Sequence, residues 1–563
     1  MKRQRSQNNV QEPNAKKIKK NKPQLSQDVL RYILGDFLYF NDVLNCLLCN
    51  SHFNIELYRL NFQTNGEMNL DKLKRIDKSH IDTYYFDDFS LIKTEKQWIV
   101  SKKISAKCFY IRDNFRESLD MHFENIEQNQ IQKIEFGYTY KHPLPEKLPK
   151  TLKVLTLRHT KNRSWSCVSG YTPDYRYGLP EELPEGLETI EFGNGENQHV
   201  LKKFPKTLKH IINWQNKPLP ENLPDSIETI EFSDRYELLL PRHLPKSLKR
   251  IKFKREYNHP LPNDLPKTLE IIEFGTEYDQ PLPTNIPPCL KQIKFGCAFN
   301  QSLPDNLPDS LEIIKFGYYF NKPLSRTIPR SLKKIKFGSN YNQPLPHYLP
   351  ETIEYIKFGN EFNQCLPEHM PKSLKKIEFG LCFNQPIQGK LPNSIEQIKL
   401  EKYFNQPIDF QFFQSLKILT IRCENKKIEF PKNLPDSLEE LYLYCPFNKP
   451  LPDKLPKSLK VLHFFHQFNQ PITIELPHTL KKIWFGKAFN QDLPENLPDS
   501  IEEIVLSNTY KRILPNKLPK SLKQITIRKT KQNLVLGQRY YNLNGFLHRE
   551  GENLMIKLKC KYW

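Results

Sequence analysis

The sequence predicts a repeat solenoid: a curved parallel β-sheet with an irregular, proline-rich convex side, preceded by a small α-helical domain. A unit of roughly 21 residues recurs through most of the 563-residue chain. The 45 prolines are spread evenly through these units, whereas residues 25–53 carry apolar side chains at helical spacing. We expect the array to occupy residues 131–530, with an N-terminal cap or linker at 65–130 and a C-terminal cap at 531–563.

Each unit is predicted to contain one short strand and an irregular return. Apolar residues at unit positions one, four and six, such as Leu290, Ile293 and Phe295, end on alternate spacing, which is typical of a strand with one buried face. Prolines in the second half of the unit remove backbone donors and exclude a helical return. One such unit cannot bury its apolar face alone, so stacked units must share a continuous core.

Two further positions of the unit carry structural signals. Glycine follows the strand at position seven, as in Gly296 and Gly317, which predicts a turn that tolerates positive φ. An aromatic residue at position ten, such as Phe299, is expected to fill the core behind that turn. The asparagine that follows it, such as Asn300, is expected to bond backbone groups of its own or the adjacent unit. A ligand-binding row of asparagines is the alternative.

The recurrent Phe-Asn-Gln sequence, present for example at residues 383–387 and 489–491, resembles the FNIP repeat. That repeat is a relative of the leucine-rich repeat and is abundant in social amoebae and giant DNA viruses. The resemblance covers about residues 131–530. It implies a leucine-rich-repeat-like solenoid that binds a partner rather than catalysing a reaction. The unit from Leu416 departs by losing the aromatic-asparagine pair, and the unit from Leu208 is shortened.

The N-terminal tail is strongly basic. Residues 1–22 contain eight Lys or Arg and one Glu, against a net charge of +22 for the whole chain. We expect residues 1–22 to be a solvated, disordered basic tail. Two basic clusters separated by a polar spacer resemble a bipartite nuclear import signal, which is the alternative. The candidate import residues are Lys2, Arg3, Lys16, Lys17, Lys19 and Lys20.

Residues 23–64 are expected to form a small helical domain. Its predicted helical hairpin carries more apolar surface than a segment of this size can bury, so a partner or the rest of the chain must cover it. The segment resembles an F-box, with Ser26 where proline is usual and Phe53 where tryptophan is common. The resemblance implies docking to a Skp-type linker and, through it, to a cullin. The expected linker-binding residues are Leu25, Val29, Leu30, Ile33, Leu34, Leu38, Val43 and Leu44.

Several classes of function are not expected. The 11 cysteines have no secreted-domain spacing, and no apolar run is long enough to span a bilayer, so we expect an intracellular protein of the cytoplasm or nucleus. Cys46 and Cys49 are interpreted as core residues rather than metal ligands. We find no P-loop, no nucleophile elbow and no zinc motif, and therefore expect no cofactor, no metal and no enzymatic activity.

The target-binding face is predicted from the repeat itself. Unit positions three and five should point to the concave side, because they alternate with the buried positions. Position five is rich in lysine and then becomes aromatic. Stacked lysines repel one another and gain nothing from folding, which favours an acidic or phosphorylated partner; solubility is the alternative. The expected binding residues are Lys252, Lys294, Lys315, Lys336, Lys357, Lys399, Tyr442 and Trp484.

Together these features predict the substrate-recognition adaptor of an F-box-type ubiquitin ligase, which binds target proteins through its repeats. The alternatives are a protein-binding scaffold without a link to ubiquitin and, less favoured, a nucleic-acid binder. An insertion interrupts the array at residues 162–175, and it is expected to be a surface loop that either has no role or contributes to binding.

Overall fold

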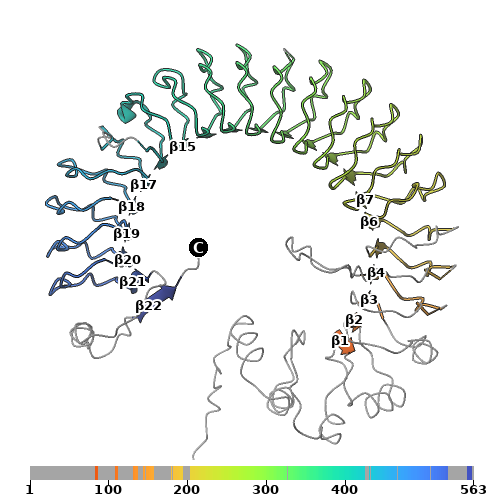
Figure 1. The fold of residues 1–563 in the computed structure, drawn as a ribbon, viewed down its shortest axis with the longest axis horizontal. Helices are drawn as coiled ribbons and strands as arrows, with labels where there is room; N and C mark the ends of the chain where they lie inside the picture. Colours follow the sequence, from red (N-terminus) through yellow and green to blue (C-terminus); the bar gives the residue numbers. More distant parts are fainter. Residues whose placement is uncertain are drawn as a thin grey trace, which may run out of the picture.

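The chain forms a curved solenoid, seen here in a computed structural model (Figure 1). In Figure 1 the strands lie along the inner rim of a long arc, and the irregular segments project outward. The structure describes residues 83–86, 108–111, 131–136, 144–145, 147–157, 179–180, 182–193, 203–325, 327–424, 430–431, 433–465, 467–507, 509–529 and 555–560.

Within these residues, 22 short strands form one sheet, and each strand runs parallel to the next one along the chain. The only helix of the described residues is the 3-10 turn η2, Phe410–Phe412. The strands are β1 Thr83–Phe86, β2 Cys108–Ile111, β3 Lys133–Phe136, β4 Val154–Leu157, β5 Thr189–Glu191, β6 His210–Trp214, β7 Thr229–Phe232, β8 Arg250–Lys252, β9 Ile271–Glu273, β10 Gln292–Lys294, β11 Ile313–Lys315, β12 Lys334–Lys336, β13 Tyr355–Lys357, β14 Lys376–Glu378, β15 Gln397–Leu400, β16 Ile418–Ile421, β17 Glu440–Leu443, β18 Val461–Phe464, β19 Lys482–Trp484, β20 Glu503–Leu506, β21 Gln524–Lys529 and β22 Met555–Cys560.

The core lies between the inner strands and the outer return segments. Unit positions one, four and six are buried as predicted: Leu290 is 0%, Ile293 1% and Phe295 3% exposed. The aromatic residue at position ten is also buried, and the ring of Phe299 stacks on Phe295 at 3.8 Å and on Phe320 at 5.9 Å. Two parallel stacks of rings therefore run through successive coils, and each coil completes the core of its neighbours.

The asparagine that follows this aromatic residue connects neighbouring coils. The side-chain oxygen of Asn321 accepts a hydrogen bond from the backbone N–H of Asn342 at 2.9 Å, and Asn342 accepts one from Asn363 in the same way. The expectation that these asparagines bond the adjacent unit is confirmed. Directly before the strand segment, the Ser310 hydroxyl donates to the carbonyl oxygen of Leu290, one coil earlier, at 2.8 Å.

The glycine at position seven has a different role from the one predicted. Among the described glycines, only Gly389 has a positive φ, and it lies outside this position. At Gly296 an added Cβ would lie 1.5 Å from the carbonyl oxygen of Gly275, and at Gly317 it would lie 1.5 Å from that of Gly296. The expectation of a turn with positive φ was wrong. Glycine is required because successive backbones approach so closely that no side chain fits between them.

The shortened unit from Leu208 is accommodated by a local irregularity. The register of β6 against β7 shifts between Ile211 and Trp214, and Asn213 takes a φ of 61°. The Trp214 side chain is 5% exposed and fills the core, while its Nε1 donates to the carbonyl oxygen of Lys217 at 2.9 Å. A large aromatic ring and a bulge thus compensate for the missing residues.

The sheet continues into both segments that were expected to cap it. Before residue 131, β1 pairs in parallel with β2, and β2 pairs with β3. After residue 530, β22 pairs in parallel with β21. The predicted F-box-like segment, the import residues, the pair Cys46 and Cys49, and the insertion at 162–175 lie outside the described residues. Within the described ranges, no helix has the length and hydrophobicity needed to cross a lipid bilayer.

Candidate binding face

The concave surface is formed by unit positions three and five. In β12, Lys334 is exposed and Lys336 half-buried, while Ile335 between them is 3% exposed. Strands β10, β11 and β13 repeat this alternation, so each of them also contributes two side chains to the inner face.

Parallel pairing places the position-five residues of successive coils in one row. The row begins on β7 and crosses the sheet through β19. In order it contains Glu231, Lys252, Glu273, Lys294, Lys315, Lys336, Lys357, Glu378, Lys399, Thr420, Tyr442, His463 and Trp484. All eight predicted binding residues therefore lie in this row, but two glutamates interrupt the lysines.

These acidic residues change the electrostatics expected for the lysine row. Four of the six predicted lysines have a carboxylate within reach: Lys252 lies 3.1 Å from Glu231, Lys294 3.7 Å from Glu273, Lys357 3.6 Å from Glu378, and Lys399 2.7 Å from Glu401. The expectation that the row gains nothing from folding was wrong for these four lysines. Each gains an ion pair, although a half-exposed pair contributes less than about 1 kcal/mol.

The middle of the row has no such compensation. Lys315 and Lys336 are not within ion-pair distance of any carboxylate in the part of the chain that the structure describes. Burial, together with the charges of Lys315 and Lys357, lowers the pKa of Lys336. The charge of Glu378 offsets this effect only in part, so the centre of the row carries excess positive charge.

Tyr355 organises one side of this centre and was missed by the sequence-based prediction. It occupies position three of β13, and the amino groups of Lys336 and Lys376 each lie 5.0 Å from its ring centroid. Its hydroxyl donates to Glu378 at 2.9 Å. Burial and this hydrogen bond raise the pKa of Tyr355, so the ring remains neutral and holds both ammonium groups beside it.

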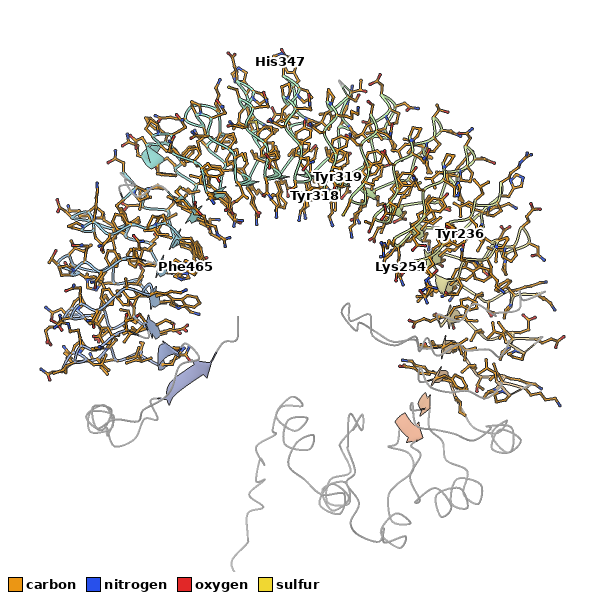
Figure 2. The ribbon with its side chains drawn as sticks, viewed as in Figure 1. Tyr236, Lys254, Tyr318, Tyr319, His347 and Phe465 are labelled. Carbon is orange, nitrogen blue, oxygen red and sulfur yellow. The ribbon has the colours of Figure 1, made fainter. Side chains whose placement is uncertain are left out.

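Two exposed aromatic rings lie beside the lysines. Tyr318 is 51% and Tyr319 54% exposed, directly after β11, and their ring centroids are 4.9 Å apart in an edge-on arrangement. Figure 2 places both near the inner rim of the arc. Unit positions eight and nine vary from coil to coil, so no periodic signal in the sequence indicated these residues.

An aromatic cluster occupies the face from β17 to β19. The predicted residues Tyr442 and Trp484 are joined through His463, whose ring centroid lies 5.8 Å from the first and 4.6 Å from the second. The Arg422 guanidinium lies 4.5 Å from the ring centroid of Tyr444. Ring contacts connect the whole cluster, which consists of Tyr442, Tyr444, His463, Phe465 and Trp484.

Charges directly before the strands follow a different rule. At unit position two, acidic and basic residues alternate along most of the array and pair between coils. Lys249 contacts Glu228 at 2.9 Å, and Lys291 contacts Glu270 at 3.0 Å. A hydrogen bond from Lys249 is the main cause of the lowered pKa of Glu228. Position two is thus electrostatically balanced with a period of two coils, whereas the centre of the position-five row is not.

A family profile matches more than half of the chain. The profile, described as "FNIP Repeat", matches residues 216–256, 257–298, 299–340, 341–382, 383–424, 447–488 and 489–530. Each match covers two coils; the match at 299–340, for example, contains β11 and β12. The profile therefore has the same two-coil period as the alternating charges at position two.

A solved structure with a similar fold is described as a leucine-rich repeat protein. CroV588, described as a novel circular leucine-rich repeat protein structure, is 28% identical with a TM-score of 0.59, over 80% of this chain and 76% of that one. YopM from Yersinia enterocolitica is 18% identical with a TM-score of 0.41, over 70% and 87% of the two chains. No curated protein matches the chain. The likeness to CroV588 confirms the leucine-rich-repeat-like fold.

Proposed function

The chain belongs to the FNIP repeat family, and we propose that it is a protein-binding scaffold that holds its partner on the concave face of the solenoid. One observation carries the proposal. At position two, residues of opposite charge alternate and form ion pairs between coils, which stabilises the fold. At position five of β10–β13, by contrast, four successive coils all carry lysine. Like charges in register destabilise a sheet, and such departures from local consistency are typical of functional sites.

Two zones on this face have complementary roles in binding. The lysines increase the rate at which an acidic partner arrives, because long-range attraction acts before contact. The aromatic cluster around Trp484 supplies contacts that slow dissociation once water is displaced. Lys357 on β13 and Tyr442 on β17 are four strand spacings apart, or about 19 Å, so one partner surface of ordinary size can cover both.

Site-specific photo-crosslinking tests the scaffold function. A crosslinking amino acid is placed at Gln292, on the concave side of β10, and in a second variant at Lys454. Lys454 occupies the unit position next to the one held by His347, which Figure 2 shows on the outer rim. We expect protein adducts from cell extract to form at the concave position and not at the convex one. Equal or stronger adducts at Lys454 would contradict a concave binding site.

A partner identified in this way allows the two zones to be separated. Lys315→Glu combined with Lys336→Glu should slow association at low salt and reduce its salt dependence. Trp484→Ala should mainly accelerate dissociation. An association rate that is unchanged by the lysine substitutions would refute the role assigned to the lysines.

We further propose that residues 23–64 connect this scaffold to a Skp-type linker and a cullin, which would make the chain a substrate-recognition adaptor of a ubiquitin ligase. The F-box-like spacing of apolar residues supports this proposal. Leu30→Asp with Ile33→Asp should abolish co-purification with the linker, while the variant Lys454→Glu retains it. If the linker fails to co-purify with the unmodified chain, the scaffold acts independently of ubiquitin.

A further inference from the structure

The concave face of strands β10–β13, called here the lysine window, carries only positive charge. Its two rows contain no acidic side chain, and among the described strands no other run of lysines at position five is as long. The basic residues of the window are Lys294, Lys315, Lys334, Lys336 and Lys357.

Glutamates close the lysine window on both sides. In the position-five row, Glu273 precedes it on β9 and Glu378 follows it on β14. Their side chains are only 14% and 12% exposed, and each is shared by two cations. Glu273 contacts Arg250 at 2.7 Å, and Glu378 contacts Lys376 at 2.9 Å, in addition to the flanking lysines of the window. Positive charge is therefore neutralised at each border.

The rim of the sheet has the same borders. At unit position nine, Glu277 is exposed in the coil of β9, just before the window, and Glu361 is exposed in the coil of β13, the last one of the window. Between them this position is occupied by the uncharged residues Ala298, Tyr319 and Asn340. The rows at unit positions five and nine thus both have acidic residues near the two ends of the lysine window. These residues define how far along the face an anionic ligand can extend.

The spacing of these limits sets the size of the ligand. Lys294 and Lys357 are three strand spacings apart, or about 14 Å, and the bordering glutamates are five spacings apart, or about 24 Å. The net charge of +22 would by itself favour nucleic acid. A polyanion longer than this span, however, would extend over the ion pairs of Glu273 and Glu378, where the positive charge is already neutralised.

We propose that the lysine window binds a short anionic segment of a protein, with about four negative charges from carboxylates or phosphates, and that its glutamate borders select against long polyanions. This inference rests on the scaffold function and names the class of partner. The exposed rings of Tyr318 and Tyr319 favour a protein segment over an inorganic polyanion, because they offer contacts to the side chains that flank the charges.

Fluorescence anisotropy with the full chain tests the proposal directly. The probes are labelled peptides of one length that carry four phosphoserines, four glutamates or four glutamines, and a labelled 20-nucleotide single-stranded DNA. We expect at least one anionic peptide to bind more tightly than the DNA, and the glutamine peptide not to bind. Lys315→Glu with Lys336→Glu should weaken peptide binding by about tenfold or more.

The matched control carries the same change in net charge away from the window. Lys454→Glu with Lys517→Glu alters two lysines at equivalent positions of the outer return, and should change peptide affinity by less than about twofold. Circular dichroism and thermal unfolding check that both double variants fold. A second pair, Glu277→Lys with Glu361→Lys, removes the rim borders and should raise affinity for the DNA by about fivefold or more without a similar gain for the peptide.

Each outcome decides a separate question. Binding of the phosphopeptide alone identifies a phosphorylated partner, and binding of both anionic peptides identifies an acidic one. Three results would overturn the inference. The DNA could bind through the window more tightly than the peptides, the window and control variants could lose equal peptide affinity, or neither anionic peptide could bind. If crosslinking at Gln292 persists in that case, the scaffold function stands and only the class of ligand is wrong.

Discussion

Replacing Lys336 with glutamate should stabilise the free solenoid even though it removes a binding residue. Lys336 stands in register with Lys315 on one side and Lys357 on the other, so it has a like charge on both neighbouring strands. Burial and these two charges lower the pKa of Lys336, which indicates that the folded chain disfavours its protonated form. A glutamate at this position would instead have an opposite charge on both sides.

The size of the effect follows from the register. A like-charged or oppositely charged cross-strand pair changes stability by a few tenths of a kcal/mol, so reversing one charge alters each of the two contacts by about 0.6 kcal/mol. The substitution also removes the contact between the Lys336 ammonium and the Tyr355 ring, which contributes about 0.5 kcal/mol. The net stabilisation is about 0.7 kcal/mol, which corresponds to about threefold slower local opening.

Hydrogen exchange measured by mass spectrometry can resolve this change, because local opening in a repeat array need not involve the whole chain. Backbone amides of β11–β13 should exchange about threefold more slowly in Lys336→Glu at low salt, and the difference should shrink in about 0.5 M NaCl. Lys399→Glu is the control with the opposite sign, since Lys399 is in register with Glu378 and contacts Glu401 at 2.7 Å. Unchanged or faster exchange in Lys336→Glu, with Lys399→Glu also faster, would show that repulsion in the row is negligible.

Three further predictions concern the stacking of coils and the border of the window. Gly317→Ala should destabilise the array by more than about 3 kcal/mol, because its Cβ would lie 1.5 Å from a carbonyl oxygen, whereas Gly389→Ala, with open space around it, should cost about 1 kcal/mol in urea unfolding. Asn342→Ala should cost about 1–2 kcal/mol in the same assay by removing an acceptor for a backbone N–H, and Asn342→Asp, which retains the acceptor, should cost less. Burial raises the pKa of Glu378, but hydrogen bonds, first of all from Lys376, outweigh it, so the net shift is downward. Ionised Glu378 therefore stabilises the folded chain above the ordinary carboxyl pKa, and this stabilisation is lost as the pH falls through the lowered pKa of the folded state. In Glu378→Gln, the urea concentration at the unfolding midpoint should therefore depend less on pH across that acidic range.

The register of the binding face could be predicted from the sequence because parallel coils stack one period apart. Any residue at position five must then follow its equivalent in the previous coil, so the row from Lys252 to Trp484 was readable from spacing alone. The same reasoning placed the buried positions correctly. It failed for the glycine position, because one unit read by itself offers only a local explanation, whereas the carbonyl oxygen that excludes a side chain belongs to the preceding coil.

The borders of the lysine window were visible in the sequence but not interpretable there. Glu273 and Glu378 occupy position five like the lysines, yet spacing does not show that residues at position three pair with them: Arg250 from the neighbouring strand and Lys376 from the same strand. Tyr318 and Tyr319 were missed for another reason: they occupy positions without a repeated residue type, and only the folded coil shows that they remain exposed beside the window. Pairing and exposure depend on side-chain reach, which a repeat pattern does not encode.

Repulsion within the window and binding to it are consequences of the same rigid arrangement. The coils around β12 are fixed by stacked rings such as Phe337 on Phe358 at 5.5 Å, and by glycines that leave no space between backbones. The sheet cannot separate its strands to relieve the lysines, so their repulsion persists in the free chain. An anion that settles among them removes this repulsion in addition to forming its own ion pairs, and it orders little backbone in doing so. Substitutions that relieve the repulsion in the free chain should therefore weaken anion binding by more than the loss of one ion pair alone.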